Sequence, residues 1–367
     1  MHDDTTPLNG AQRIAVGMSG GLDSSVAAAL CVDEGREVIG LTLHMFKEGS
    51  RCCSIEDVER ARRLCEHLGI RHYVINAIEW FEANVIRHFV EEYARGRTPS
   101  PCVLCNEFIK FGMLHERAGQ LGCSAVATGH YARVESRNGS LSLERPTDRK
   151  KDQTYFLHRL SQEQLKRSLF PLAGWTKEQA AKYAAEKGLP IHSAAVSESQ
   201  DLCFVPDDGH AAFVEARRPD LKRGGQILDA EGKLLGRHEG CHRYTLGQRR
   251  GLGVAAPTRL YVQELDAEAN RVVLGAREDV LSRECLVEDV HWISGAAPAD
   301  QFSCTGRVRY RHEAAAVHVT ILPDQRMQLE FEEPQFAITP GQAAVLYDGE
   351  TVLGGGWIAD HRESFRV

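Results

Sequence analysis

No apolar run in this 367-residue sequence approaches the length needed to span a membrane. The first ten residues, MHDDTTPLNG, also lack the basic and apolar regions of a secretory signal peptide. We therefore expect a cytoplasmic protein that does not associate with membranes. In that compartment its 11 cysteines stay reduced unless they bind a metal or take part in chemistry.

The sequence also has no excess of positive charge, since its formal net charge is −7. This excludes a protein that binds polyanions indiscriminately, but not one with a local basic surface. There are four short basic clusters, and all but the first contain interleaved aromatic residues or glycines, which suit base stacking and close approach to a nucleic acid. They are RPTDRKKD (145–152), EARRPDLKRGG (215–225), HRYTLGQRRG (242–251) and RVRYRH (307–312).

The first half of the sequence alternates between short apolar runs and segments with helical periodicity. Strands are predicted at RIAVGM (13–18), EVIGLTLHMF (37–46), RHYVINAI (71–78) and SAVATGHYARV (124–134). Helices are predicted at 24–35, 54–69, 80–96 and 106–122, and residues from about 160 to 190 are predicted to be mainly helical. Such alternation indicates an α/β fold with a parallel sheet and helices on both of its faces.

Beyond about residue 210 the pattern changes to short alternating segments separated by Gly, Asp and Asn turns, which predict β hairpins. From about residue 287 these segments are typical of a small antiparallel barrel. We predict an α/β catalytic domain (1–208, with a helical tail from about 160), a central mainly-β domain (209–284) and a C-terminal β-barrel domain (285–367).

A glycine- and serine-rich loop, AVGMSGGLDSSV (15–26), lies where the first predicted strand meets the first helix. Its backbone N–H groups, its hydroxyls and the positive end of the helix together form an anion cradle. The loop lacks the Gly-Lys-Ser/Thr of a Walker motif and the GxGxxG of a dinucleotide fold. We assign to nucleotide binding the residues Gly17, Met18, Ser19, Gly20, Gly21, Asp23, Ser24 and Ser25.

This loop resembles the SGGxDS signature of the N-type ATP pyrophosphatases, the PP-loop superfamily. The resemblance implies a doubly wound parallel sheet of the adenine nucleotide alpha hydrolase-like type. It also implies that ATP is cleaved to pyrophosphate while an oxygen is adenylated, with Asp23 helping to hold Mg²⁺ beside the β- and γ-phosphates. The loop alone does not identify the acceptor.

Seven further segments, in the same order, resemble the tRNA-specific 2-thiouridylase (MnmA) family. They are GRTPSPCVLCNEFIKF (96–111), ATGHYAR (127–133), KDQTYFL (151–157), ESQDLCFV (198–205), HRYTLGQRRGLG (242–253), RVRYR (307–311) and TPGQAAVLYDGETVLGGG (339–356). The resemblance implies that sulfur replaces O2 of the wobble uridine in tRNAs for Lys, Glu and Gln, with release of AMP and pyrophosphate. It also implies a monomer that receives sulfur from a donor or relay protein.

The same resemblance assigns Cys105 as the nucleophile and Cys203 as the residue that carries a persulfide. Cys105 directly precedes a helix predicted to start near Asn106, where the helix dipole favours a thiolate. The commoner family pattern, Asn-Pro-Asp-x-x-Cys, is here Ser100-Pro101-Cys102-x-x-Cys105.

A third thiol therefore stands beside the two that the resemblance assigns. Cys102, Cys105 and Cys203 together suit a [4Fe–4S] cluster with one open iron, which we favour. A persulfide route with Cys102 as a helper and a structural zinc site remain as alternatives.

Other ligand contacts follow from position or from the resemblance. Met45, at the end of the second strand, is expected near the adenine, and Gly129 admits adenosine by close backbone approach. The predicted contacts with tRNA are Ser100, Pro101, Cys102, His130, Lys151, Asp152, Gln153, Arg309, Tyr310 and Gln342. Arginine suits phosphates or base edges, and tyrosine suits stacking on an unpaired base.

Two other functions compete with this interpretation. A PP-loop ligase or amidotransferase acting on a small carboxylate would need neither the β modules with basic, aromatic edges nor paired cysteines. A tRNA-binding protein without catalysis would not be expected to retain every donor of SGGLDSS.

Overall fold

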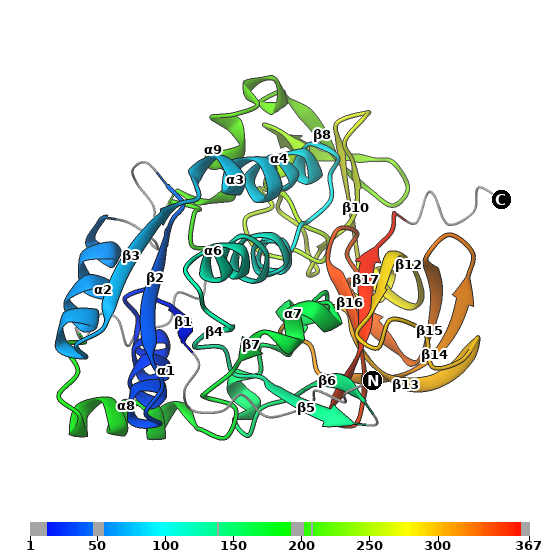
Figure 1. Ribbon diagram of the computed structural model, residues 1–367. Helices are drawn as coiled ribbons and strands as arrows, with labels where there is room; N and C mark the ends of the chain where they lie inside the picture. Colours follow the sequence, from blue (N-terminus) through cyan, green and yellow to red (C-terminus); the bar gives the residue numbers. More distant parts are fainter. Residues whose placement is uncertain (1–12, 47–54, 138, 192–201, 207, 361–367) are drawn as a thin grey trace.

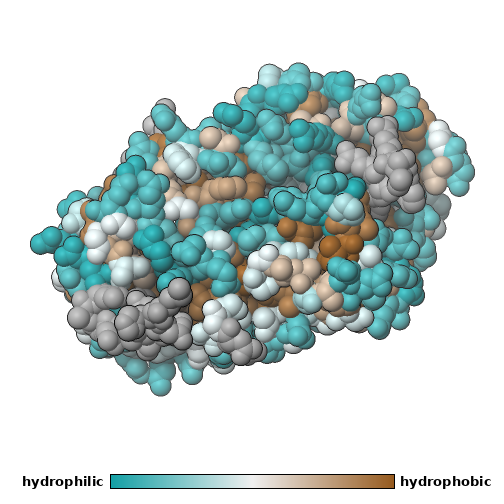
Figure 2. Space-filling model, turned by 45° about the vertical axis from the view of Figure 1, so that its right-hand side comes forward, coloured by the Kyte–Doolittle hydropathy of each residue, from teal (hydrophilic) through white to brown (hydrophobic). Residues whose placement is uncertain are grey.

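A computed structural model describes residues 13–46, 55–137, 139–191, 202–206 and 208–360. These residues form three sheets with helices packed around the first (Figure 1). Among the described helices, none is both long and apolar enough to cross a membrane. On the face drawn in Figure 2, hydrophilic residues cover most of the surface and hydrophobic residues gather in separate patches.

The first sheet has five parallel strands in the order β3-β2-β1-β4-β7. The strands are β1 (Ile14–Gly17), β2 (Val38–His44), β3 (Arg71–Asn76), β4 (Ala125–Ala127) and β7 (Ser168–Leu169). The chain moves outward from β1 to β3 and then returns to the other side of β1, so the order reverses between β1 and β4. Ligands of such doubly wound sheets bind at the carboxyl ends of the strands, at this reversal.

Helices bury both faces of β1, β2 and β4, which is why these strands are apolar without alternation, whereas the edge strand β3 is partly exposed. On β1, Ile14 and Val16 face one hydrophobic cluster and Ala15 faces the other. The first face packs on α1 (Leu22–Asp33), α2 (Ile55–His67) and α8 (Lys177–Glu186). The second packs on α4 (Arg87–Ala94), the π-helix η2 (Cys105–Met113) and α6 (Leu114–Gln120). The doubly wound α/β prediction is confirmed.

Shorter helical segments connect these elements. The α-helical and π-helical ones are α3 (Ile78–Phe81), the π-helix η1 (Glu82–Ile86), α5 (Pro101–Leu104), α7 (Gln162–Lys166) and α9 (Gly209–Glu215). The 3₁₀ turns are η3 (Arg149–Lys151), η4 (Thr154–Leu157), η6 (Pro219–Leu221), η7 (Cys241–Arg243) and η8 (Glu278–Val280). The run α3–η1–α4 corresponds to the single helix predicted over 80–96.

The central module is a four-stranded sheet in the order β10-β11-β8-β9. Its strands are β8 (Gly225–Asp229), β9 (Leu234–His238), β10 (Tyr261–Asp266) and β11 (Arg271–Gly275). Pairing is antiparallel except between β8 and β11. Ile227, Val262 and Val272 are fully buried in its own hydrophobic cluster, so this module has a separate small core.

The C-terminal module is a closed six-stranded antiparallel barrel. Its strands are β12 (Leu281–Trp292), β13 (Gln301–Arg307), β14 (Ala315–Leu322), β15 (Arg326–Phe336), β16 (Ala343–Asp348) and β17 (Thr351–Ile358). The order β12-β15-β14-β13-β16-β17 closes because β12 also pairs with β17. Closure leaves no open edge among these six strands. The barrel predicted from the sequence is confirmed, and its first strand begins at Leu281, ahead of the predicted module boundary at 284/285.

A hairpin from the first module joins the barrel sheet. β5 (Arg133–Arg137) and β6 (Ser140–Glu144) pair with each other, and Leu143 and Glu144 pair with β17. The single strand predicted over 124–134 is therefore wrong: β4 ends at Ala127 and β5 starts at Arg133. The intervening turn carries Gly129 and His130, which places both at the carboxyl end of the parallel sheet.

The first module and the barrel share one hydrophobic core. Leu143 and Tyr155 lie in the same buried cluster as Val345 and Tyr347 of β16. The buried Tyr155 hydroxyl donates a hydrogen bond to the carbonyl oxygen of Ala343, 2.9 Å away. The barrel is thus held by core packing rather than by surface contacts alone.

Tyr155→Phe tests this connection. It leaves the Ala343 carbonyl without its donor in a buried site, so we expect the free energy of unfolding to fall by about 1–2 kcal/mol. The measurement is the shift in the midpoint of urea unfolding. An unchanged midpoint would show that this hydrogen bond contributes nothing to the junction.

Candidate functional site

The glycine-rich loop joins β1 to α1 and is shaped by hydrogen bonds within itself. Gly20 has φ +72°, and an added Cβ would lie 2.8 Å from the carbonyl oxygen of Asp57. Only glycine fits there without distortion. The hydroxyls of Ser24 and Ser25 both donate to the carbonyl of Gly21, at 3.1 and 2.7 Å. Ser25 is buried, so its hydroxyl braces the loop rather than projecting from it.

A cavity of about 220 Å³, which we call the loop cavity, opens beside this loop. It lies at the carboxyl ends of β1, β2 and β4. Leu41, Leu43, Met45 and Leu114 supply an apolar wall, which suits a purine ring. Met45 and Gly129, which the sequence analysis assigned to adenine and adenosine contact, both line this cavity. The remaining lining residues are Gly17, Met18, Ser19, Asp23, Ser24, Lys110, Thr128, Gly129, His130 and Gln153.

A larger cavity of about 940 Å³, which we call the basic cavity, extends from the loop to the barrel. Its lining includes Ser19, Gly21 and Asp23 of the loop and Cys102 of the cysteine segment. Seven cationic side chains line it: Lys110, Arg149, Lys150, Lys151, Lys177, Arg307 and Arg311. Its carboxylates are Asp23, Asp152 and Glu313. Although the whole chain is acidic, this interior surface attracts polyanions.

The cysteine segment differs from its prediction at the helix start. The helix begins at Pro101, with Ser100 as N-cap, rather than near Asn106. Proline at the first helical position and serine before it are strong start signals. Cys102 therefore lies in the first turn and lines the basic cavity, whereas Cys105 begins the π-helix one turn later and is 8% exposed.

Cys203 lies in a turn beside the same region. Its neighbour Leu202 lines the basic cavity with Cys102. The Cys203 side chain is partly exposed and packs against the hydrophobic cluster that contains Cys105. Residues 192–201, which include the start of the ESQDLCFV segment, lie outside the described residues.

A three-thiolate metal site does not fit this arrangement. Cys102, Cys105 and Cys203 are all described, yet the described residues contain no group of three Cys, His, Asp or Glu side chains placed to hold one metal ion. The [4Fe–4S] hypothesis and the zinc alternative therefore receive no support from the geometry.

Three sequence families match the chain in succession. They are described as a tRNA methyl transferase HUP domain (residues 12–207), a tRNA methyl transferase PRC-barrel domain (211–276) and an aminomethyltransferase beta-barrel domain (282–358). The tRNA-specific 2-thiouridylase MnmA of Geobacter metallireducens is 46% identical over 358 residues, covering 95% of this chain and 96% of that protein. The chain belongs to the tRNA-specific 2-thiouridylase family.

Other members of this family are equally similar. The MnmA protein of Trichormus variabilis is 47% identical over 351 residues, covering 95% of this chain and 98% of that protein.

Among solved structures, a 4-thiouridine synthetase–RNA complex with bound ATP is 18% identical to this chain and has a TM-score of 0.36. The match covers 57% of this chain and 51% of the synthetase chain. A likeness that weak supports no statement about this chain.

In this thiouridylase-family chain, most of the predicted tRNA contacts line the basic cavity. They are Ser100, Pro101, Cys102, His130, Lys151, Asp152, Gln153, Tyr310 and Gln342. Arg309 does not line it. Its guanidinium donates to the carbonyl of Leu246 (3.1 Å) and to the hydroxyl of Thr339, and burial lowers its pKa. In this geometry Arg309 connects the central module to the barrel.

Two of these cavity residues have structural partners that limit what they can do. Asp152 is buried and forms ion pairs with Arg145 (3.3 Å) and Arg307 (3.5 Å), so its charge is balanced within the protein. The Gln342 amide donates to the carbonyls of Thr98 and Pro99, at 2.9 and 3.0 Å. Gln342 therefore holds the backbone that leads into the cysteine segment.

His130 is an uncharged histidine. Burial lowers its pKa well below the ordinary value, and Nδ1 lies 2.9 Å from the Thr128 hydroxyl. Its ring packs near Phe111 and Phe170. At neutral pH this imidazole offers a hydrogen bond, not a positive charge, to whatever enters either cavity.

Several cavity residues were not assigned individually from the sequence. Arg149, Lys150, Arg307 and Arg311 belong to basic clusters that the sequence did single out. Phe156, whose ring centroid lies 4.3 Å from that of Tyr310, adds an aromatic wall beside them. Nothing in the sequence marked Lys177 as a functional residue, because a lysine at the start of an amphipathic helix is common.

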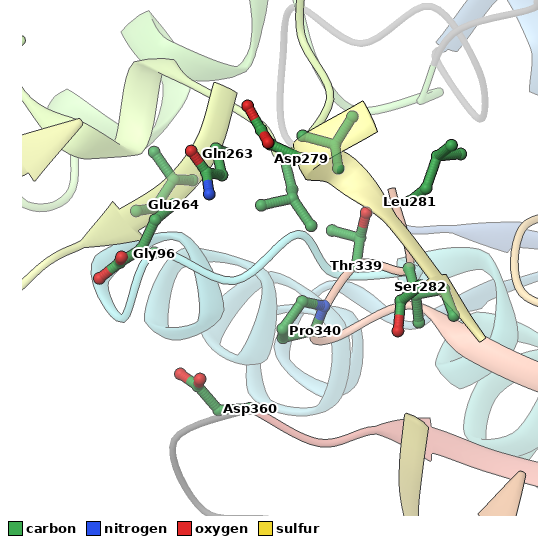
Figure 3. Close-up of a pocket in the computed structure, with 13 residues that line it drawn as sticks. Gly96, Gln263, Glu264, Asp279, Leu281, Ser282, Thr339, Pro340 and Asp360 are labelled. Carbon is green, nitrogen blue, oxygen red and sulfur yellow. The ribbon is translucent and has the colours of Figure 1, made fainter. Parts of the chain in front are cut away.

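A third cavity, of about 360 Å³, lies where the three modules meet (Figure 3). Glu264 of β10, Asp279 of η8 and Asp360 after β17 bring three carboxylates to its wall, which Gly96 and Thr339 also line. The described lining contains no Lys, Arg or His. An acidic wall repels phosphates, so this cavity is not a candidate for ATP or RNA.

Proposed function

We propose that this chain is an ATP-dependent tRNA 2-thiouridylase, which adenylates O2 of a uridine in tRNA and replaces that oxygen with sulfur. Membership of the family supports the reaction class. The observation that carries the proposal is the basic cavity, whose wall includes both Asp23 of the glycine-rich loop and Cys102 of the cysteine segment. Nucleotide activation and sulfur delivery can then act on one base.

The electrostatics of the cavity support an RNA substrate. Its cations outnumber its carboxylates, and the carboxylate of Asp152 is balanced by arginines. The aromatic pair Phe156 and Tyr310 offers a surface on which an unstacked base can lie. A wobble uridine that leaves the anticodon stack could enter here, which is how enzymes reach an atom of a stacked base.

The first chemical step activates a poor leaving group. O2 of the uracil attacks the α-phosphorus of ATP, pyrophosphate leaves, and the base loses its N3 proton. Backbone N–H groups and hydroxyls of Ser19–Ser24 are suited to the phosphates. The carboxylate of Asp23 fits Mg²⁺, which would neutralise phosphate charge when bound.

The second step replaces the oxygen. By family resemblance, Cys203 carries a persulfide supplied by a sulfur donor, and its outer sulfur attacks C2. The C2–O2 bond breaks and AMP leaves with the oxygen. The Cys105 thiolate then attacks the Cys203 sulfur, which frees 2-thiouridine and leaves a Cys105–Cys203 disulfide for an external reductant to reduce.

One assay tests the whole proposal. The protein is incubated with ATP, a persulfide donor and unmodified tRNA, and the digested tRNA is analysed by mass spectrometry. We expect 2-thiouridine together with AMP and pyrophosphate. AMP and pyrophosphate without thiolated nucleoside would favour a PP-loop ligase, and tRNA binding without ATP cleavage would favour a non-catalytic protein.

The role of Cys102 has its own test. If Cys102 acts as a polar helper in the first helical turn, Cys102→Asp, which restores the commoner family pattern, should keep thiolation within about tenfold of wild type. Cys102→Ala should lose about 10²–10³-fold, the scale of a lost general acid–base group. Thiolation rates of the purified variants are compared, with iron content and visible spectra recorded under anaerobic conditions.

A cluster-dependent mechanism makes the opposite prediction. Stoichiometric iron in the wild-type protein, lost together with activity in Cys102→Asp, would overturn the helper role and restore the iron–sulfur hypothesis. Full activity in Cys102→Ala would overturn both.

A further inference from the structure

A lysine from outside the loop holds the one carboxylate that the loop presents. Lys177 is the first residue of α8, 154 positions beyond Asp23 in the sequence. Its Nζ lies 2.7 Å from Oδ1 and 2.8 Å from Oδ2 of Asp23. Lys177 and Asp23 both line the basic cavity beside Ser19 and Gly21.

A second donor completes the surroundings of this carboxylate. The Tyr131 hydroxyl donates to Oδ1 of Asp23 at 3.1 Å. Asp23 is thus positioned by one neutral donor, Tyr131, and by one movable cation, Lys177.

The loop needs a cation that its own residues do not supply. The segment Gly17–Ser25 contains no lysine or arginine and includes the negative Asp23. Its donors are neutral N–H and O–H groups, whereas a bound triphosphate carries three to four negative charges. The Walker motif solves this problem with its own lysine, and this loop has none.

The backbone of Lys177 is fixed while its ammonium can move. Thr176 caps α8 through a capping box with Gln179. The Asp148 carboxylate accepts hydrogen bonds from the backbone N–H of Lys177 (3.0 Å) and from that of Lys150 (3.1 Å) in the basic segment 149–151. Beyond this anchor lies a flexible four-carbon stem, which lets Nζ move several ångströms.

We propose that Lys177 binds the β- and γ-phosphates of ATP and stabilises the departing pyrophosphate. Asp23 would hold the Mg²⁺ that accompanies ATP, and the ammonium of Lys177, released from that carboxylate, would bind the phosphate oxygens beside it. This inference deepens the proposed function and rests on it for the identity of the nucleotide. No covalent bond to Lys177 is formed or broken in this role.

A purely structural role is the alternative, since the Lys177–Asp23 pair also ties α8 to α1. The same helix pair provides a matched control. Lys187, at the C-terminal end of α8, pairs with Asp33, the last residue of α1, at 2.7 Å. Lys187 lines neither the loop cavity nor the basic cavity, so it reports on helix attachment alone.

The test compares ATP with AMP, which lacks the β- and γ-phosphates. Binding of each nucleotide with Mg²⁺ to the full chain is measured by calorimetry without tRNA. For Lys177→Met we expect ATP affinity to fall about 10- to 100-fold, the range for a lost charge-assisted hydrogen bond, with AMP affinity within about twofold of wild type. Lys187→Met should leave both affinities within about twofold.

Three results would overturn the proposal: ATP bound by Lys177→Met within twofold of wild type, equal losses for ATP and AMP, or equal losses in the Lys187 control. Should Lys177→Met not fold, Lys177→Gln is measured in the same way. The assay is independent of thiolation. A wild-type protein that binds ATP through Lys177 but makes no 2-thiouridine would refute the proposed function and leave this inference standing, whereas a wild-type protein that does not bind ATP would refute both.

Discussion

Gly129→Ala is expected to abolish ATP binding, with a loss of at least about 100-fold. An added Cβ would lie 2.6 Å from the Asp23 carbonyl carbon, 2.6 Å from the Ser24 nitrogen and 2.9 Å from the Asp23 oxygen. All three are backbone atoms at the start of α1, so no side-chain rotation can relieve the clash. The glycine-rich loop must move, and forcing extra atoms into a packed site costs about 1–3 kcal/mol in stability as well.

Gly174→Ala is the matched control. Its added Cβ would meet no atom within 4 Å, and its backbone does not have a positive φ. We expect unchanged nucleotide affinity and unfolding temperature for this variant. ATP affinity is measured by the same calorimetry. If Gly129→Ala binds ATP as tightly as the wild type does, the turn after β4 does not touch the nucleotide.

Cys105→Ser and Cys203→Ser are each expected to lower thiolation by at least about 10³-fold, the scale seen when a nucleophile is removed. A hydroxyl neither carries a persulfide nor attacks one at neutral pH. Adenylation does not require either thiol, so single-turnover pyrophosphate release with tRNA should stay within about threefold of wild type. The measurements are 2-thiouridine by mass spectrometry and pyrophosphate by enzymatic coupling.

Cys304→Ser provides the control for these cysteine variants. Cys304 is half-buried on β13 of the barrel, and burial raises the pKa of its thiol to about 12, so it remains protonated. Its replacement should leave thiolation unchanged. Loss of pyrophosphate release together with thiolation in Cys105→Ser would mean that the cysteine positions the base rather than delivering sulfur.

The local periodicity of the sequence predicted the elements that depend on local physics. β1, β2 and β3, and the helices between them, follow from apolar runs and helical spacing that each segment carries by itself. Elements that exist only through distant partners were missed. β7 has two residues and pairs with β4, and the hairpin β5–β6 joins β17, more than 200 residues away.

The start of the helix that carries Cys102 and Cys105 was also predicted incorrectly from the sequence. Ser100 and Pro101 are helix start signals, and the helix does begin at Pro101. The prediction instead placed its start near Asn106. The structure moves Cys102 into the first turn and Cys105 into the second. Cys102 therefore lines the basic cavity, while Cys105 is buried one turn further along.

The sequence by itself determined the chemistry that this protein can attempt, because the anion cradle SGGLDSS and the segments around Cys105 and Cys203 are each short motifs that can be recognised without the fold. Only the tertiary structure decided where those groups meet. Cys102, Asp23, Tyr310 and Lys177 come from four distant segments and line one cavity, while Arg309 turns inward to join two modules. Side-chain direction and long-range pairing depend on the packing of the whole chain, and no short segment encodes that packing.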